Sequence, residues 1–314
     1  ALLYVTNVNA LDKGDQFTKG NITYQVTQMG VSGISPSSYT EVMVVSSDAT
    51  GTLTIPDIIT DPNNQYYCKV TAIGSQSNMP NVTAVNLPHT LKTINANAFT
   101  PSKITSITVP KETDNIVDGA FSQMNKLTEI NVEAGNPKYS SEDGILYETR
   151  STGKYIKAYP YAKSGTTFTV PTGTYGVAIN AFAKHPTLTT INLPASIQDL
   201  PTSEEANGFT GASALTAIKV DPSNGFYKDI DGVVLTKDGK TLVTYPYKRD
   251  GVLNPTYNGT PAQHPGMVYK IPDGVETLAK GSFALVNEVT AIQLNNVKTI
   301  EKGAFYAKIG RAHV

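Results

Sequence analysis

The sequence predicts a β-rich repeat solenoid, built as a stack of short coils. Two observations predict it: a four-residue pattern of alternating apolar and polar residues recurs along the chain, and an aromatic residue follows most copies at a nearly constant distance. Self-similarity at a period of about 20–50 residues indicates stacked units, because one unit cannot bury its apolar face alone. The first apolar residues of the nine copies are Leu53, Val85, Ile107, Ile130, Phe168, Ile191, Ile218, Tyr269 and Ile292. Four of the eight intervals are 22 or 23 residues, which sets the unit length.

Each unit is predicted to contain two short extended pieces and a turn. In Ile107-Thr108-Val109-Pro110 the alternation places both apolar side chains on one face of a strand, and proline ends the strand because it cannot donate to a ladder. An aliphatic residue such as Ile116 begins the second extended piece. The pair Ala120-Phe121 then turns the chain, with phenylalanine filling the coil interior. Little helix is expected, since the unit leaves room for one turn at most.

Two long intervals contain similar insertions, at about 134–166 and 222–254. Both contain Asn, Tyr and Asp-Gly at matching offsets, and both return through Tyr-Pro-Tyr. Asp-Gly between alternating apolar runs is a strong hairpin signal. We therefore expect each insertion to be a β-hairpin that projects from one edge of the solenoid.

The two ends of the chain depart from the repeat. Residues 1–50 contain strand-like runs and are expected to cap the open end of the solenoid, which spans 51–308. The last six residues, 309–314, fit no repeat and are expected to be a non-native tail. Leu2-Leu3-Tyr4-Val5 is too short for a signal-peptide core, so we expect that any export signal has been removed.

Composition narrows the classes of partner. A net charge of −1 gives no field that would attract nucleic acid or an anionic membrane. No run of about 18 apolar residues is present, so a membrane association is expected only through a lost anchor. The single cysteine, Cys68, excludes an intramolecular disulfide and a cysteine metal cluster, and its strand-like surroundings indicate a small core residue.

A search for catalytic and metal-binding patterns gives no candidate, so we expect no catalytic residue, no metal site, no cofactor and no enzyme activity. The histidines lack partners at metal-ligand spacing and are expected in loops or on the surface. Ser151-Thr152-Gly153-Lys154 matches Ser-x-x-Lys but falls at a predicted hairpin tip. The Asp-Gly segments lack the ligands of a calcium loop, and the adjacent Glu204 and Glu205 would point apart on a strand. The four histidines are His89, His185, His264 and His313.

The repeat resembles the BspA-type leucine-rich-repeat family of host-associated bacteria. The resemblance rests on Leu-x-x-Ile-x-Leu-Pro, a following aliphatic residue and Ala-Phe, seen clearly from Leu188 to Pro194, and on the Tyr-x-x-x-Asp-Gly insertions. It extends from about Gly51 to Phe305 and implies a right-handed leucine-rich-repeat coil stack. It also implies an exported protein of the bacterial cell surface or extracellular space, and some members are adhesins. It implies no catalytic residue, since the motif consists of core positions.

These observations predict a non-enzymatic surface protein that binds host extracellular-matrix or microbial surface protein, or a glycan. One candidate surface is the row of outward middle positions of the repeated strands. Tyrosine suits contact surfaces, so the Tyr-Pro-Tyr segments are a second candidate, unless these rings pack the hairpins onto the solenoid. A glycan-binding protein for nutrient capture and a structural spacer displaying a lost C-terminal domain remain alternatives. The strand candidates are Thr108, Asn131, Asn192, Lys219 and Gln293, and the hairpin candidates are Tyr159, Tyr161, Tyr245 and Tyr247.

Overall fold

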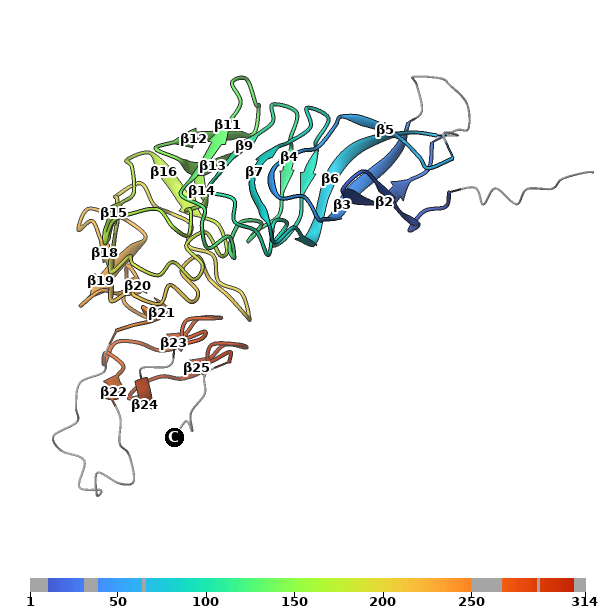
Figure 1. The fold of residues 1–314 in the computed structure, drawn as a ribbon. Coiled ribbons are helices and arrows are strands. Elements are labelled where there is room, and N and C mark those ends of the chain that lie inside the picture. Colours follow the sequence, from blue (N-terminus) through green and yellow to red (C-terminus); the bar gives the residue numbers. More distant parts are fainter. Residues whose placement is uncertain (1–10, 31–38, 64–65, 250–266, 287–288, 308–314) are drawn as a thin grey trace, which may run out of the picture. The chain divides into compact units, whose positions relative to one another are not determined.

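A computed structural model of the chain describes residues 11–30, 39–63, 66–249, 267–286 and 289–307 (Figure 1). In these residues it contains 25 β-strands and no helix. The chain divides into two compact units, Ala1–Ser141 and Glu142–Val314. The predicted tail at 309–314 and the run from Leu2 to Val5 lie outside the described residues, as do His264 and His313.

Eleven strands lie wholly within the first unit: β1 (Gln16–Lys19), β2 (Ile22–Gln28), β3 (Thr40–Ser47), β4 (Gly51–Thr54), β5 (Ile58–Thr60), β6 (Tyr67–Asn78), β7 (Val82–Asn86), β8 (Thr93–Ile94), β9 (Ser106–Val109), β10 (Asn115–Ile116) and β11 (Glu129–Val132). The longest strands of the first unit are β2, β3 and β6, and the strands of the later coils are short. Strand β12 (Tyr139–Glu142) lies at the end of this unit.

The strands of the second unit are all short. They are β13 (Ile145–Arg150), β14 (Gly153–Ala158), β15 (Thr167–Thr169), β16 (Thr174–Val177), β17 (Thr190–Leu193), β18 (Ala217–Val220), β19 (Tyr227–Ile230), β20 (Val233–Thr236), β21 (Thr241–Thr244), β22 (Met267–Lys270), β23 (Thr277–Leu278), β24 (Val289–Gln293) and β25 (Thr299–Ile300).

The recurring sequence pattern forms one set of strands, which we call motif strands. They pair in parallel as β4 with β7, β9 with β11, β15 with β17, β17 with β18, and β22 with β24. Within a ladder equivalent residues stand opposite one another, so that Ile107 faces Ile130 and Ile191 faces Ile218. These apolar side chains are buried, as the alternation predicts. The β-rich repeat fold is thereby confirmed.

The second extended piece of each repeat forms a separate set of parallel ladders. In the first unit β6 pairs with β8 and β8 with β10, which places Ile73, Ile94 and Ile116 in line. The N-terminal strands extend this sheet, because β1 pairs antiparallel with β2, β2 pairs antiparallel with β3, and β3 pairs parallel with β6. Residues from the predicted cap therefore continue a ladder of the solenoid.

In each of the two compact units, the turns of successive coils place their aromatic rings in a column in the interior. Phe99 stacks on Phe121 with ring centroids 6.2 Å apart, and Phe182 stacks on Phe209 at 5.5 Å. The backbone joins successive turns directly, as where the Phe182 amide donates to the Gly208 carbonyl at 2.9 Å. Burial of one such ring accounts for roughly 2–3 kcal/mol of stabilisation.

The insertions differ from the projecting hairpins that we predicted. The Asp231-Gly232 turn does connect antiparallel β19 and β20, with positive φ at both residues. The returning strands, however, lie inside the second ladders: β14 is parallel to β16, and β21 is parallel to β23. Each insertion is thus part of a coil, because its last strand supplies the second extended piece that every coil requires.

An asparagine fixes the start of each insertion, fully buried at Asn224 and half-buried at Asn136. The Asn224 amide donates to the carbonyls of Pro194 and Ile197 in the preceding coil, at 3.1 and 2.8 Å. Its side-chain oxygen accepts from the amides of Phe226 and Tyr227, each at 2.8 Å. Asn136 makes the equivalent contacts in the first unit, to Pro110, Thr113, Lys138 and Tyr139. The recurring asparagine therefore pairs backbone groups that the departing chain would leave unsatisfied.

Candidate binding surface

The five strand candidates occupy the outward middle positions of motif strands. Thr108, Lys219 and Gln293 are exposed, whereas Asn131 and Asn192 are half-buried. Thr108 stands opposite Asn131 in the β9–β11 ladder, and Asn192 stands opposite Lys219 in the β17–β18 ladder. The structure thus brings these residues together as two pairs, with Gln293 in the separate β22–β24 ladder.

Four further residues, which we did not predict, occupy the same register: Thr54, Asn86, Thr169 and Lys270. Each directly follows the first apolar residue of its repeat, so the spacing itself carried the signal. Three of them take part in polar contacts along the ladders. Asn86 donates to the Thr54 hydroxyl, and Asn192 donates to the Thr169 hydroxyl, both at 3.0 Å. The outward rows are therefore ordered polar arrays with the strand spacing of about 4.8 Å.

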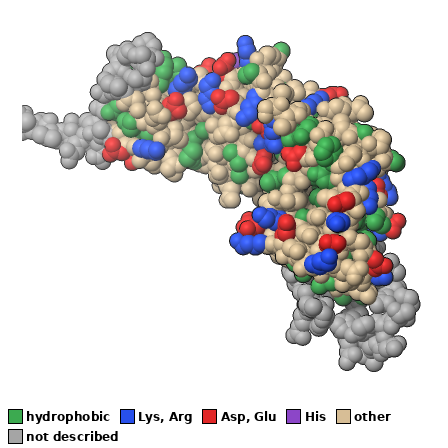
Figure 2. All heavy atoms as spheres, turned by 180° about the vertical axis from the view of Figure 1, so that it is seen from behind, with side chains coloured by type: hydrophobic (Ala, Val, Ile, Leu, Met, Phe, Trp, Pro, Cys, Tyr) green, Lys and Arg blue, Asp and Glu red, His purple; other side chains and the backbone are tan. Residues whose placement is uncertain are grey.

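Charge is sparse and mixed on these rows. Lys219 lies 3.4 Å from Asp229 of the adjoining hairpin, and Asp229 also accepts from the backbone amides of Val220 and Gly232. Lys270 lies 3.5 Å from Asp273 in an exposed pair. On the face of the molecule shown in Figure 2, basic and acidic side chains are interspersed with one another and with hydrophobic ones. Such a surface favours short-range hydrogen bonding over long-range attraction.

Two of the four hairpin tyrosines are not available to a partner, which corrects our prediction. Tyr159 is 7% exposed and Tyr245 is 3% exposed. Their rings extend the aromatic column, with centroids 5.3 Å from Phe182 and 5.0 Å from Phe283. Burial raises the pKa of Tyr159 to about 12. Tyr161 and Tyr247 are half-buried and remain candidates.

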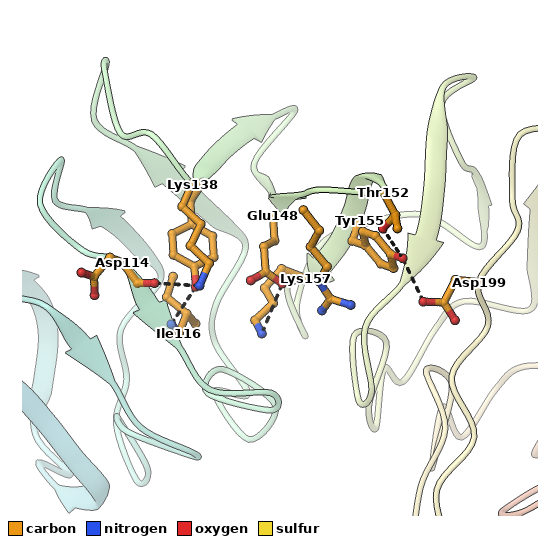
Figure 3. Close-up of polar contacts among 10 residues, drawn as sticks. Asp114, Ile116, Lys138, Glu148, Thr152, Tyr155, Lys157 and Asp199 are labelled. Atoms are coloured by element: carbon orange, nitrogen blue, oxygen red, sulfur yellow. Dashed lines mark hydrogen bonds and ion pairs between the residues drawn. The ribbon is translucent and has the colours of Figure 1, made fainter.

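The polar groups of the first insertion hold the hairpin in place. In the second unit, the Tyr155 hydroxyl donates to Asp199 at 2.9 Å and contacts the Thr152 hydroxyl at 3.0 Å (Figure 3). Glu148 and Lys157 form a buried pair, with nitrogen and oxygen 3.8 Å apart. Such pairs fix geometry more than they add stability, because desolvation offsets the attraction. At the end of the first unit, Lys138 donates to the Asp114 carbonyl (Figure 3).

The Ser-x-x-Lys match is a turn, as predicted. Arg150 and Gly153 close the β13–β14 hairpin, so Ser151 and Thr152 form its tip. The Lys154 ammonium lies 2.8 Å from Glu142 and 4.0 Å from the ring centre of Tyr147. These contacts give the lysine a structural role in the hairpin.

The isolated titratable residues are explained by packing, although one expectation was wrong. Cys68 is buried, and burial, followed by the charge of Asp61, raises the pKa of its thiol to about 11. His185 lies in the loop before β17, but it is fully buried against Tyr159 and not on the surface, because it occupies a core position three residues after Phe182. His89 is exposed and lies 3.4 Å from Asp57.

The described part of the chain contains neither a group of metal ligands nor a membrane-spanning helix. Within it, no three or more His, Cys, Asp or Glu side chains are grouped so that they could hold a metal ion. None of its segments forms a helix long and apolar enough to cross a membrane.

Stacked coils with motif strands, second strands and an aromatic column define a β-rich repeat fold. Residues 64–150 and 268–310 match the family model of the BspA type leucine-rich repeat region, in six copies. These two segments are therefore BspA-type leucine-rich repeats, as the sequence pattern predicted. Residues 151–249 lie outside the match but contain the same parallel ladders and stacked rings.

Several solved bacterial structures are similar to this chain at low identity. The pneumococcal vaccine antigen PcpA is 18% identical, with 96% of this chain and 71% of that chain covered and a TM-score of 0.42. A leucine-rich cell surface protein from Faecalibacterium prausnitzii is 15% identical, covering 92% and 95%, with a TM-score of 0.41. A leucine-rich repeat protein from Eubacterium ventriosum is 17% identical, covering 93% and 94%, with a TM-score of 0.43. A comparison with curated proteins gives no match.

Proposed function

We propose that this chain is a non-enzymatic binding module of a bacterial surface protein, acting as an adhesin toward host matrix or microbial surface proteins. The observation that carries the proposal is the presence of ordered polar rows on the motif strands of each unit. Within each ladder the members of a row sit in register and project outward, while the apolar members of the same strands form the core. The family supports a binding role, since leucine-rich repeats generally mediate protein–protein interactions.

The architecture separates binding from folding, which suits a module that binds other molecules. Substitution of an outward middle residue leaves the inward apolar residues of its strand unchanged. Asn192, for example, makes an exposed hydrogen bond to Thr169, whose loss should cost no more than about 1 kcal/mol of stability. The surface can therefore vary without loss of the solenoid.

A combined substitution tests the proposal. The variant Thr108→Ala/Asn131→Ala/Asn192→Ala/Lys219→Ala/Gln293→Ala should lose at least about tenfold in affinity for immobilised fibronectin, fibrinogen, laminin or whole bacterial cells, whichever the wild type binds. Its circular dichroism and melting temperature should stay close to wild type. The matched control Gln123→Ala/Asn125→Ala/Lys126→Ala changes exposed residues in one turn and should bind normally.

The outcomes separate three possibilities. Undiminished binding by the five-residue variant would show that this surface is assigned wrongly. A saturable signal that free sugars abolish would favour the glycan-binding alternative. Failure of the wild type to bind any of these proteins or cells would favour the spacer.

A further inference from the structure

A polar hollow lies in the N-terminal part of the first unit, and no outward residue of a motif strand lines it. Its volume is about 370 Å³. Three segments line it: the turn between β1 and β2, the end of β3, and the end of β6 with the segment that follows it. The lining residues are Thr18, Asn21, Thr23, Ser46, Ser47, Asp48, Asn78, Pro80 and Asn81.

Backbone contacts hold the walls of this hollow in place. The Asp48 amide and the Ser47 hydroxyl both donate to the Asn21 carbonyl, at 3.2 and 2.7 Å. The Gly51 amide donates to the Asn81 carbonyl at 3.0 Å. Ser46 and Asn78 stand opposite each other where β3 pairs with β6. The lining groups are thus presented by sheet ends that are already joined, which is the arrangement a binding site needs.

Part of the lining is available to a ligand. Thr18 and Thr23 contact each other at 3.0 Å, and Ser47 is taken up by the wall. Among the described residues, no protein group forms a hydrogen bond with the side chains of Asn21, Ser46, Asp48 and Asn78. The hollow therefore gathers two amides, a hydroxyl and a carboxylate without protein partners around one volume.

The chemistry of the lining selects a class of ligand. It contains no lysine or arginine for an anion and no aromatic or large aliphatic side chain for an apolar molecule. One carboxylate is too little negative charge for a calcium site of ordinary affinity. Amides donate and accept at once, while a carboxylate accepts from two hydroxyls, so the set matches a neutral compound with several adjacent hydroxyl groups. The volume lies at the lower end of the range for small-ligand sites, about 300–1,000 Å³.

We propose that this hollow binds a neutral sugar residue, with Asp48 accepting hydrogen bonds from its hydroxyl groups and Asn21, Asn78 and Ser46 completing the contacts. The site uses none of the motif-strand residues, so it stands or falls independently of the protein-binding surface. It gives the chain a second kind of recognition, toward an uncharged glycan.

The test uses the full chain and immobilised polymers. Biolayer interferometry would compare binding to three neutral polymers, α-mannan, β-galactan and α-glucan, and to heparin as an anionic polymer. The wild type should bind at least one neutral polymer, and a free monosaccharide of that polymer should compete. Asp48→Ala/Asn78→Ala should weaken this binding about tenfold or more, because at least two hydrogen bonds to the ligand are lost.

Two controls make the result decisive. Asp114→Ala/Asn115→Ala removes an exposed acid and an exposed amide of the same unit outside the hollow and should bind like the wild type. The five-residue motif-strand variant should also retain glycan binding, which separates this proposal from the proposed function. Asn21→Ala provides a second hollow variant, with an unchanged melting temperature as the check on folding.

Three results would overturn the proposal. These are no wild-type binding to the three neutral polymers, equal binding by the Asp48→Ala/Asn78→Ala variant, and binding to heparin alone. A fourth result would also overturn it. If all binding required added Ca²⁺ and the Asp48→Ala/Asn78→Ala variant lost that binding, the hollow would be assigned to a cation.

Discussion

At the residue scale, single polar side chains decide where the chain can leave and rejoin the stack. Asn224 and Asn136 each satisfy backbone groups of the preceding coil and of the first residues of an insertion, and His185, after the Phe182 turn, also satisfies backbone groups. The His185 ring accepts from the Leu188 amide at 3.2 Å through Nδ1, so its Nε2 donates to the Lys163 carbonyl at 3.2 Å. Asn224 and His185 are fully buried, which makes the loss of either side chain costly.

Removal of the Asn224 amide should destabilise the second unit strongly. Asn224→Ala leaves several buried backbone groups unpaired, so we expect the free energy of unfolding to fall by about 3 kcal/mol in urea titration. Asn224→Asp should also destabilise it, since a carboxylate cannot donate to the carbonyls of Pro194 and Ile197. Asn125→Ala, at an exposed position, is the control and should change stability by less than about 0.5 kcal/mol. Equal stability of the Asn224→Ala and Asn125→Ala variants would contradict this role.

His185 should make stability depend on pH. Burial lowers its pKa from 6.5 to about 4, against the smaller opposite effect of the bond to Lys163. Because the folded-state pKa is below the unfolded one, the contribution of the neutral ring is fully present above pH 6.5 and is lost as the pH falls toward 4. The corresponding free energy is on the order of 2–3 kcal/mol.

A comparison of two histidine variants isolates this effect from the titration of carboxyl groups. His185→Gln should be less stable than wild type at pH 7.5, and the difference should narrow by pH 4.5 in urea unfolding. His89→Gln changes an exposed histidine and should keep the wild-type pH dependence. A difference between wild type and His185→Gln that stays constant with pH would refute the buried-neutral assignment.

At the element scale, an aromatic ring closes each coil, and the residue that supplies it can vary. Tyr159 and Tyr245 occupy the column position that phenylalanine holds elsewhere. Their backbones confirm the equivalence, because the Tyr159 amide donates to the Ala181 carbonyl and the Tyr245 amide to the Ser282 carbonyl, both at 2.8 Å. The Phe283 amide makes the same contact to the Ala304 carbonyl, also at 2.8 Å.

If the Tyr159 ring fills the phenylalanine position, its hydroxyl should matter less than its ring. Tyr159→Phe should therefore change the free energy of unfolding by less than about 1.5 kcal/mol, whereas Tyr159→Ala should lower it by about 3–5 kcal/mol. Hydrogen exchange should localise the damage to strands β14, β16 and β17, because stacked repeats interact with their nearest neighbours. A uniform loss of protection across the second unit would contradict this expectation.

Much of the strand arrangement could be predicted from the sequence. The alternation at Ile107, Ile130, Ile191 and Ile218 identified parallel motif strands correctly, because burial on one face requires that period. The return of the insertions into the ladder was missed, since the Asp-Gly turns report only local hairpin geometry. The spacing did contain a signal: Tyr159 precedes Phe182 by 23 residues, the unit length.

The candidate sites were predictable only in part, for a physical reason. Outward strand positions follow from alternation, so Thr108 and Lys219 could be placed. The hollow around Asp48 could not, because it joins three segments that share no sequence period. The interior position of His185 was likewise hidden, since no sequence pattern indicates a histidine that pairs with two backbone groups.

At the scale of the whole molecule, near-neutral charge limits how the chain can find a partner. With a net charge of −1 and interspersed signs, long-range steering should contribute little. Affinity for a protein or glycan partner should accordingly change by less than about threefold between about 50 and 300 mM NaCl, measured by biolayer interferometry. A tenfold or larger fall over this range would indicate a charged contact surface in place of the polar rows and the hollow.

The ring at the coil closure has a consequence for how such chains diversify. In a coil with an insertion, asparagine fixes the start of the insertion and an aromatic ring closes the coil after it. The number of residues between the asparagine and the ring is therefore not fixed. Insertion and deletion can then act within a single coil while the remaining coils keep their alignment. New exposed surface can therefore be gained in one coil without any change to the packing of its neighbours.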